Sequence, residues 1–222
     1  MKTRLTFVIT PLAVTIVVLA LLAFPAKAGR SNATLKPSPD LPLNQLLPIA
    51  SGHINGFWLQ SFYAQRLRYT TPTMVYYTQP VQTPCGIAAM NNAFYCSASN
   101  SIYYDYNFMS SMYSQVGDYA AVSILAHEWG HLVQTQLGIA NGRAFSIQME
   151  LQADCLSGAY TQYAEKMGVL EEGDMEEAGV GLFRAGDPKG MPWFAPLAHG
   201  KPMQRISAFL DGYKGGAQVC LR

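Results

Sequence analysis

His127 and His131 lie four positions apart and, with Glu128 directly after the first of them, form the run His-Glu-Trp-Gly-His. In an α-helix, residues four positions apart share a face, so both imidazoles can reach one metal ion from the same side. Glu128 projects a step further around the helix, where its carboxylate can take a proton from metal-bound water without being a ligand itself. The spacing therefore predicts a zinc site that performs hydrolysis.

A catalytic zinc needs a third protein ligand, because the fourth position is left to water. Glu150 is the candidate for this ligand, and Asp154 follows it at the same spacing of four. We expect Asp154 to accept the outer N–H of a ligand histidine, which fixes the tautomer of that histidine and raises its basicity. An exposed acidic helix edge is the alternative. Met149 and Cys155 flank the pair, however, and unpaired carboxylates are rare among apolar neighbours.

Two helices must position these side chains. Residues Gly117 to Gly138 are expected to form one helix, with Asp118 near its start and the final glycine as its terminator. Apolar residues gather on the side away from the histidines, so this helix is expected to bury one face and present the other. A core helix with two stray histidines is the alternative, but the chain holds only four histidines. A second helix, from about Ser146 to Lys166, carries Glu150 and Asp154.

The other predicted elements are shorter. They are a helix from about Ile54 to Arg66, a strand from Thr73 to Thr78, a hairpin of Ala93–Cys96 and Ser101–Asp105, and helical pieces near Asp174–Arg184 and Met203–Tyr213. This order predicts an α+β domain at residues 48–222, with a small mixed sheet packed on a helical layer and the metal site between two helices. Ser101–Asp105 is expected to be the outer strand, where an extended peptide can add by main-chain hydrogen bonds. Gly130 either marks the close approach of another backbone to the metal helix or is a harmless packing residue.

The motifs occur in an order that resembles a known family. The run at His127, followed by Glu-Leu-Gln-Ala-Asp-Cys at residues 150–155, resembles the gluzincin pattern and in particular the bacterial neutral zinc metallopeptidases. Weaker matches flank it in order, namely Pro84-Cys85-Gly86, Phe94-Tyr95-Cys96, Gly186-Asp187, His199-Gly200 and Gln204-Arg205. The likeness covers roughly residues 55 to 215 and implies a zincin-like fold, one zinc ion per chain, and a peptide or protein substrate. Ser97 and Ser99 depart from the family, which usually carries proline and aspartate there, so the hairpin loop is expected to differ in shape.

Residues 1–28 are expected to direct export. Two basic residues precede an apolar run from about Leu5 to Phe24, and Ala26-Lys27-Ala28 then forms a cleavage site. A cleaved signal peptide is the first interpretation, and a retained signal-anchor is the alternative, because the apolar run is long enough to span a bilayer. Either way the catalytic part is expected outside the cytoplasm, secreted or anchored to the membrane. Residues 29–47, rich in proline, serine and asparagine, are expected to form a linker.

Four cysteines in an exported chain suit two disulfides, and no Cys-x-x-Cys spacing indicates a metal site. Of the three pairings that four cysteines allow, we favour Cys85–Cys96 together with Cys155–Cys220. The first would staple the predicted hairpin, and the second would tie the end of the chain to the helix that carries Glu150. A structural metal site built from thiolates is the alternative.

Transition-state stabilisation needs a donor aimed at the developing oxyanion, and His199 is the candidate for this catalytic role. A surface histidine before a helix is the alternative interpretation, and Tyr103 and Tyr104 are weaker candidates.

Five acidic residues lie between Glu171 and Glu177. They are interpreted as the solvated start of a helix and not as a calcium loop, because they lack the spacing of such a loop.

The charge balance argues against a nucleic-acid partner. Without residues 1–28 the chain carries 12 basic and 14 acidic residues, a net charge of −2, so no basic surface for a phosphate backbone is expected.

The sequence predicts an exported zinc metalloendopeptidase, a hydrolase in which His127, His131 and Glu150 bind zinc and Glu128 is the general base. A zinc-containing binding or scaffold protein without hydrolytic activity is the alternative, although such a protein would have no use for Glu128. No oligomeric state is predicted.

Overall fold

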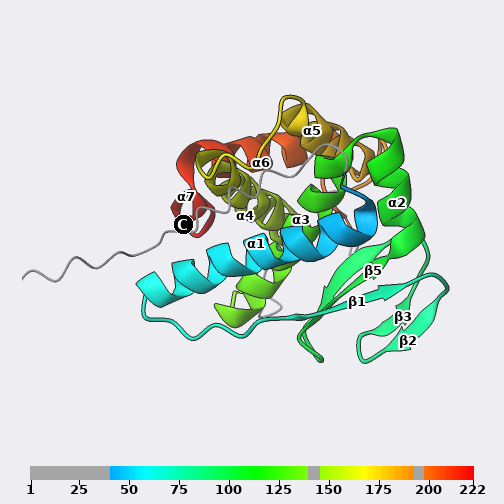
Figure 1. Cartoon of the computed structure of the whole chain (residues 1–222), viewed down its shortest axis with the longest axis horizontal. Helices are drawn as coiled ribbons and strands as arrows, with labels where there is room; N and C mark the ends of the chain where they lie inside the picture. The colour runs from blue at the N-terminus through cyan, green and yellow to red at the C-terminus, as the bar shows by residue number, and fades with distance from the viewer. Residues whose placement is uncertain (1–40, 140–145, 193–197) are drawn as a thin grey trace, which may run out of the picture. The chain divides into compact units, whose positions relative to one another are not determined.

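The computed structural model describes residues 41–139, 146–192 and 198–222. Within these ranges the helices are α1 (Leu43–Ala64), α2 (Tyr106–Gln115), α3 (Asp118–Gln136), α4 (Ser146–Lys166), α5 (Asp174–Arg184), α6 (Pro202–Gly215) and α7 (Ala217–Cys220) (Figure 1). The strands are β1 (Thr73–Tyr77), β2 (Val81–Thr83), β3 (Gly86–Ala88), β4 (Ala93–Cys96) and β5 (Ser101–Asp105). The predicted export segment and most of the predicted linker lie outside the described residues. None of the helices in the described ranges combines the length and the apolar character that crossing a bilayer requires.

The sheet confirms the predicted α+β class and corrects one detail of it. β1 pairs in parallel with β5, and β4 pairs with the other edge of β5 in antiparallel fashion, so the strand order is β1-β5-β4. The prediction that Ser101–Asp105 is the outer strand is therefore wrong. This strand is central, and it is buried at four of its five positions because elements cover it on both sides. The outer strand next to the cleft is β4.

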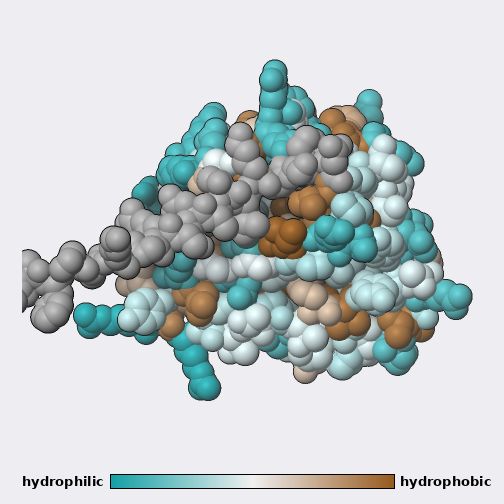
Figure 2. Space-filling view, viewed as in Figure 1, coloured by the Kyte–Doolittle hydropathy of each residue, from teal (hydrophilic) through white to brown (hydrophobic). Residues whose placement is uncertain are grey.

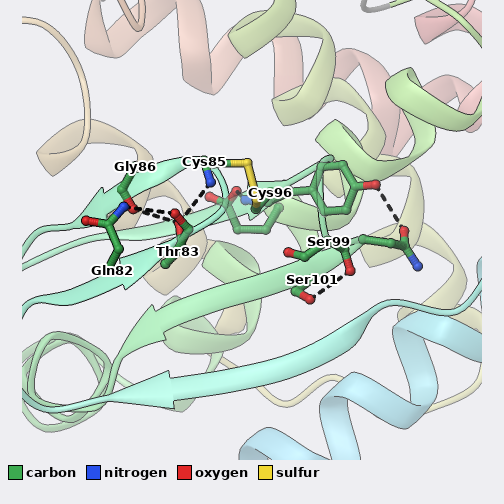
Figure 3. The surroundings of a disulfide bond; sticks show 10 residues. Gln82, Thr83, Cys85, Gly86, Cys96, Ser99 and Ser101 are labelled. Carbon is green, nitrogen blue, oxygen red and sulfur yellow. Dashed lines mark hydrogen bonds between the residues drawn. A yellow bond between two sulfur atoms is a disulfide. The ribbon is translucent and has the colours of Figure 1, made fainter.

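A second, two-stranded sheet, formed by β2 and β3, is joined to β4 by a disulfide. Cys85 lies in the turn of this hairpin and is bonded to Cys96 at the end of β4, as Figure 3 shows. The side chain of Thr83 closes the turn, since its hydroxyl donates to the carbonyl of Gly86 and accepts from the N–H of Cys85. The pairing was predicted, but the bond fastens the β2–β3 hairpin to β4 and does not staple the β4–β5 hairpin.

Helices α3 and α4 cross at close range, and this contact brings the metal-site residues together. A Cβ atom at Gly130 of α3 would lie 2.7 Å from Cα of Ala153 in α4, closer than two such atoms can approach. Of the two interpretations left open for Gly130, the structure shows the close approach of another backbone. α4 packs equally tightly on α6, because a Cβ at Gly158 would lie 1.9 Å from the carbonyl oxygen of Phe209. Cys155 of α4 is bonded to Cys220 of α7, which confirms the second predicted disulfide.

Helix α1 packs against α3 and begins earlier than predicted (Figure 1). The expected start was Ile54, but the helix begins at Leu43 and continues through Pro48. Proline disfavours a helix interior, yet the leucines of the first two turns are buried in the core and their packing outweighs this preference. The last residues of the predicted linker therefore belong to the folded domain.

On the face shown in Figure 2, hydrophobic side chains form small groups separated by hydrophilic ones, as is usual for a protein surface.

Candidate metal centre and cleft

Three side chains from α3 and α4, His127, His131 and Glu150, converge on one point, and we call them the metal cluster. Nε2 of His127 lies 3.1 Å from Nε2 of His131 and 3.2 Å from Oε2 of Glu150, and Nε2 of His131 lies 3.4 Å from Oε1 of Glu150. Ligand atoms at about 2.0–2.1 Å from a tetrahedral zinc lie about 3.3 Å from one another. The donor set and its spacing therefore fit a zinc ion with one open position.

The metal cluster lies in a cleft of about 620 Å³. α3 forms its floor, β4 and the residues before it line one side, and the end of α5 together with α6 lines another. Tyr103 and Tyr104, the weaker candidates for a catalytic donor, are not among the lining residues. Tyr104 is buried, and the ring of Tyr103 stacks on Phe94 at 5.3 Å between centroids. Phe94 and Tyr95 of β4 are the aromatic residues that line this side of the cleft.

Glu128 lies in the same cleft and is held by the outer strand. The backbone N–H of Tyr95 donates to Oε2 of Glu128 over 2.9 Å, so β4 fixes the direction of this carboxylate. Burial raises the pKa of Glu128, and the charges of His127 and His131 only partly reverse that rise. A carboxyl group with a raised pKa next to the metal cluster is suited to accepting and returning a proton.

Asp154 holds His127 from behind, and Arg205 of α6 in turn holds Asp154. Nδ1 of His127 lies 2.8 Å from Oδ1 of Asp154, the contact predicted for an outer partner. Arg205 donates to Asp154 through Nε and Nη2, both at 2.8 Å, and through Nη1 to the carbonyl of Ala185. Arg205 is only 4% exposed, so this bidentate pair is screened from water. The sequence contained one signal for this arginine, the weak family-like match at Gln204-Arg205, but it did not reveal the partner.

The electrostatics of the metal cluster follow from this network. Burial alone would lower the pKa of His127, but the charge and hydrogen bond of Asp154 outweigh it and raise the pKa to about 10. Burial alone would raise the pKa of Glu150, but hydrogen bonds from His127 and His131 outweigh it and hold that pKa well below its usual range. Metal binding to such a cluster competes with protons and releases them.

Gln134 is the outer partner of His131, and sequence reasoning missed it. Its Oε1 lies 2.9 Å from Nδ1 of His131, and the side chain is completely buried. The residue stands three positions after His131 on α3, which places it on the same side of the helix. That spacing was a signal in the sequence, but a buried glutamine within an apolar stretch does not by itself indicate a metal site.

His199 lines the cleft and is half exposed. Its Nδ1 lies 3.5 Å from Oδ1 of Asp187, and the carboxylate of Asp187 also accepts from the backbone N–H groups of His199 and Gly200. The family-like pairs Gly186-Asp187 and His199-Gly200 are thus in contact with each other. The catalytic role of His199 stays a prediction.

A second group of acidic side chains, Asp118, Asp174 and Glu177, also lies close together, and we call it the acidic cluster. The prediction of a solvated helix start is wrong for Asp174, which is only 5% exposed. Its Oδ2 accepts from the N–H of Glu171 over 2.8 Å. Glu177 accepts from the N–H of Tyr119 over 2.9 Å and so caps α3, whose N-cap residue Gly117 has no side chain for the purpose. Burial raises the pKa of Asp174 to about 6.

The chain resembles known proteins along most of its length. The family described as putative neutral zinc metallopeptidase matches residues 26–220. Uncharacterized protein YpfJ of Escherichia coli K12 is 30% identical over 215 residues, which cover 86% of this chain and 75% of that protein. Uncharacterized protein Mb2605 of Mycobacterium bovis is 32% identical over 182 residues, which cover 68% of this chain and 62% of that protein. No solved structure matches the chain. The chain therefore belongs to the family of putative neutral zinc metallopeptidases.

Proposed function

We propose that this protein is an exported zinc-dependent endopeptidase. The observation that carries the proposal is the metal cluster, in which the donor atoms of three side chains from two helices lie 3.1–3.4 Å from one another beside the carboxylate of Glu128. Two imidazoles and one carboxylate are a ligand set found in catalytic zinc sites, where one position stays open. A purely structural zinc is usually enclosed by four protein ligands, so the open cleft favours a catalytic site.

Each residue of the cleft has a proposed task. Zinc bound by His127, His131 and Glu150 would act as a Lewis acid, activating water and polarising the scissile carbonyl. Glu128 takes a proton from the attacking water and returns it to the leaving amine, which its raised pKa favours. His199 donates to the developing oxyanion from its place in the same cleft.

The outer strand β4 is the proposed binding edge for the substrate. One edge of β4 pairs with β5, and the other faces α3, where the N–H of Tyr95 already bonds Glu128. An extended peptide that adds to this edge would lie directly beside the metal cluster. We therefore propose β4 as the substrate edge, whereas the sequence had favoured Ser101–Asp105.

Two disulfides support the proposal of export. Cys85–Cys96 and Cys155–Cys220 are both formed, and such bonds persist mainly outside the reducing cytosol. The apolar run from about Leu5 to Phe24 is the proposed export signal, with cleavage or retention as an anchor both compatible with this function.

The test is to compare cleavage of unfolded casein by wild type and by Glu128→Gln, with the zinc content of both proteins measured. We expect one zinc per chain in both and a loss of activity of about 10²–10⁴-fold in the variant, because the proton acceptor is gone while the ligands remain. Glu176→Gln is the matched control, since Glu176 is exposed and lies outside the cleft. Equal activity of Glu128→Gln and wild type with zinc retained would exclude this mechanism. Zinc without activity in either protein would favour a binding or scaffold protein.

A further inference from the structure

The amide of Gln134 joins the two helices that carry the metal cluster. Its Oε1 lies 2.9 Å from Nδ1 of His131, and its Nε2 donates to the carbonyl of Met149 over 2.7 Å. Met149 directly precedes Glu150, so one buried side chain contacts a ligand on α3 and the backbone beside a ligand on α4. The same Nε2 also donates to Oε1 of Gln152 over 3.1 Å.

This arrangement selects one tautomer of His131. A backbone carbonyl can only accept a hydrogen bond, so the group of Gln134 that faces Met149 must be the amide nitrogen. The group that faces His131 is then the amide oxygen, which can only accept. Nδ1 of His131 must therefore carry a proton. When the imidazole is neutral, the lone pair is on Nε2, the atom that points into the metal cluster.

The hydrogen bonds continue from Gln134 to the C-terminal end of the chain. Nε2 of Gln152 donates to the backbone carbonyl of Cys220 over 2.8 Å, which leaves its Oε1 free to accept from Gln134. Cys220 ends the short helix α7 and is bonded to Cys155 of α4. Three hydrogen bonds thus connect a disulfide-tethered carbonyl with His131.

We propose that Gln134 and Gln152 are positioning residues, and that α7 with its disulfide is a remote support for the metal cluster. The inference rests on the proposed zinc site, because it assigns these residues the task of holding His131 in its metal-binding tautomer. Outer partners of metal ligands typically contribute a factor of about 10–100 to metal affinity. The contribution of Gln152 acts through Gln134 and is smaller.

The test measures zinc affinity by competition with a chelator, and the tautomer of His131 by nitrogen NMR of the zinc-free protein at a pH at which this imidazole is neutral. In Gln134→Met, which keeps the length of the side chain and loses its polar atoms, we expect about 10–100-fold weaker zinc binding and a mixture of His131 tautomers. Gln134→Glu still accepts from His131 but cannot donate to Met149, so it should restore the Nδ1–H tautomer and part of the affinity.

Gln136 provides the matched control. It lies on the same helix and also makes two hydrogen bonds, accepting from the N–H of Thr70 and donating to its carbonyl, but neither reaches the metal cluster. Gln136→Met should therefore bind zinc as tightly as wild type. Gln152→Met, and Cys155→Ser combined with Cys220→Ser, should weaken zinc binding in the same direction by less than about tenfold.

The inference is overturned if Gln134→Met binds zinc as tightly as Gln136→Met and His131 keeps its proton on Nδ1. The outcome is independent of peptidase activity. If wild type binds zinc but cleaves no peptide, the proposed function fails, while the affinities of these variants still decide the role of Gln134. If wild type binds no zinc, the tautomer measurement decides whether Gln134 holds His131.

Discussion

Within the part of the chain that the structure describes, two groups of side chains each bring three potential metal-ligand atoms within 4.8 Å of one another. The metal cluster consists of His127, His131 and Glu150, and the acidic cluster of Asp118, Asp174 and Glu177. Both include residues of α3, the first at its middle and the second at its start. Both groups meet this distance limit, so the limit alone does not tell them apart.

Their hydrogen-bond partners separate them. In the acidic cluster, one oxygen each of Asp174 and Glu177 accepts from a backbone N–H, and the bond of Glu177 satisfies the start of α3. In the metal cluster, Asp154 and Gln134 contact the outer nitrogens of the two histidines, and the inner nitrogens converge. Proximity of potential ligands is therefore weak evidence for a metal site. Hydrogen-bond partners that hold the outer atoms of the ligands and so aim their inner atoms at one point are strong evidence.

The largest expected difference between the clusters is in zinc affinity. Glu150→Ala removes a ligand and should weaken zinc binding by more than about 100-fold, because losing a ligand costs more than losing its outer partner. Glu177→Ala should leave zinc affinity unchanged and lower stability by about 1 kcal/mol, since α3 loses its cap. Chelator competition and chemical denaturation measure the two quantities. Weaker zinc binding in Glu177→Ala would contradict the assignment of the clusters.

A smaller difference is expected for glycines near the two clusters. Gly130→Ala would force a Cβ against Ala153 and push α3 from α4, so we expect a loss of about 1–3 kcal/mol in the free energy of unfolding, together with weaker zinc binding. Gly179 of α5 has nothing within 4 Å of an added Cβ, so Gly179→Ala should stabilise the protein by about 0.5–1 kcal/mol. Denaturation of zinc-free protein measures both. Equal stability of the two variants would show that α3 and α4 can separate freely.

The smallest expected effect is a pH dependence of the acidic cluster. Burial raises the pKa of Asp174 from 3.8 to about 6, so the folded state holds its proton more tightly than the unfolded state. The resulting stability is present below pH 4 and is lost as the pH rises through 6. Asp174→Asn removes the titrating group. The change in the free energy of unfolding between low and high pH should therefore shrink by on the order of 1 kcal/mol, a value that allows for solvent screening. Denaturation of chelator-treated protein at pH 4.5 and 7.5 tests it, and an identical pH profile in both proteins would contradict it.

Local patterns predicted the site helices well. The spacing of His127 and His131 and the terminating glycine located α3 within a residue or two, and α4 has the predicted bounds. The paired carboxylates also appear where the helical period puts them, with Glu150 toward the histidines and Asp154 behind His127. Such features depend on neighbours three or four positions away, which the sequence shows directly.

The errors concern contacts between distant segments. The parallel pairing of β1 with β5 makes Ser101–Asp105 a central strand, and nothing in its own residues distinguishes a central strand from an outer one that is buried by other elements. The start of α1 was misplaced because the packing of its leucines on the core outweighs the effect of Pro48. Asp174 was expected to be exposed to solvent, because neither its burial nor its bond to the N–H of Glu171 can be read from the pattern of acidic residues.

The sequence by itself determined the donor atoms of the metal cluster and the helical faces that carry them, because residue types and a period of 3.6 decide these locally. Only the tertiary structure decided that Arg205 holds Asp154, that Gln134 holds His131 and that β4 borders the cleft. Arg205 and β4 belong to elements other than those that carry the ligands, and the contact of Gln134 depends on its burial between two helices. How closely the elements pack decides these contacts.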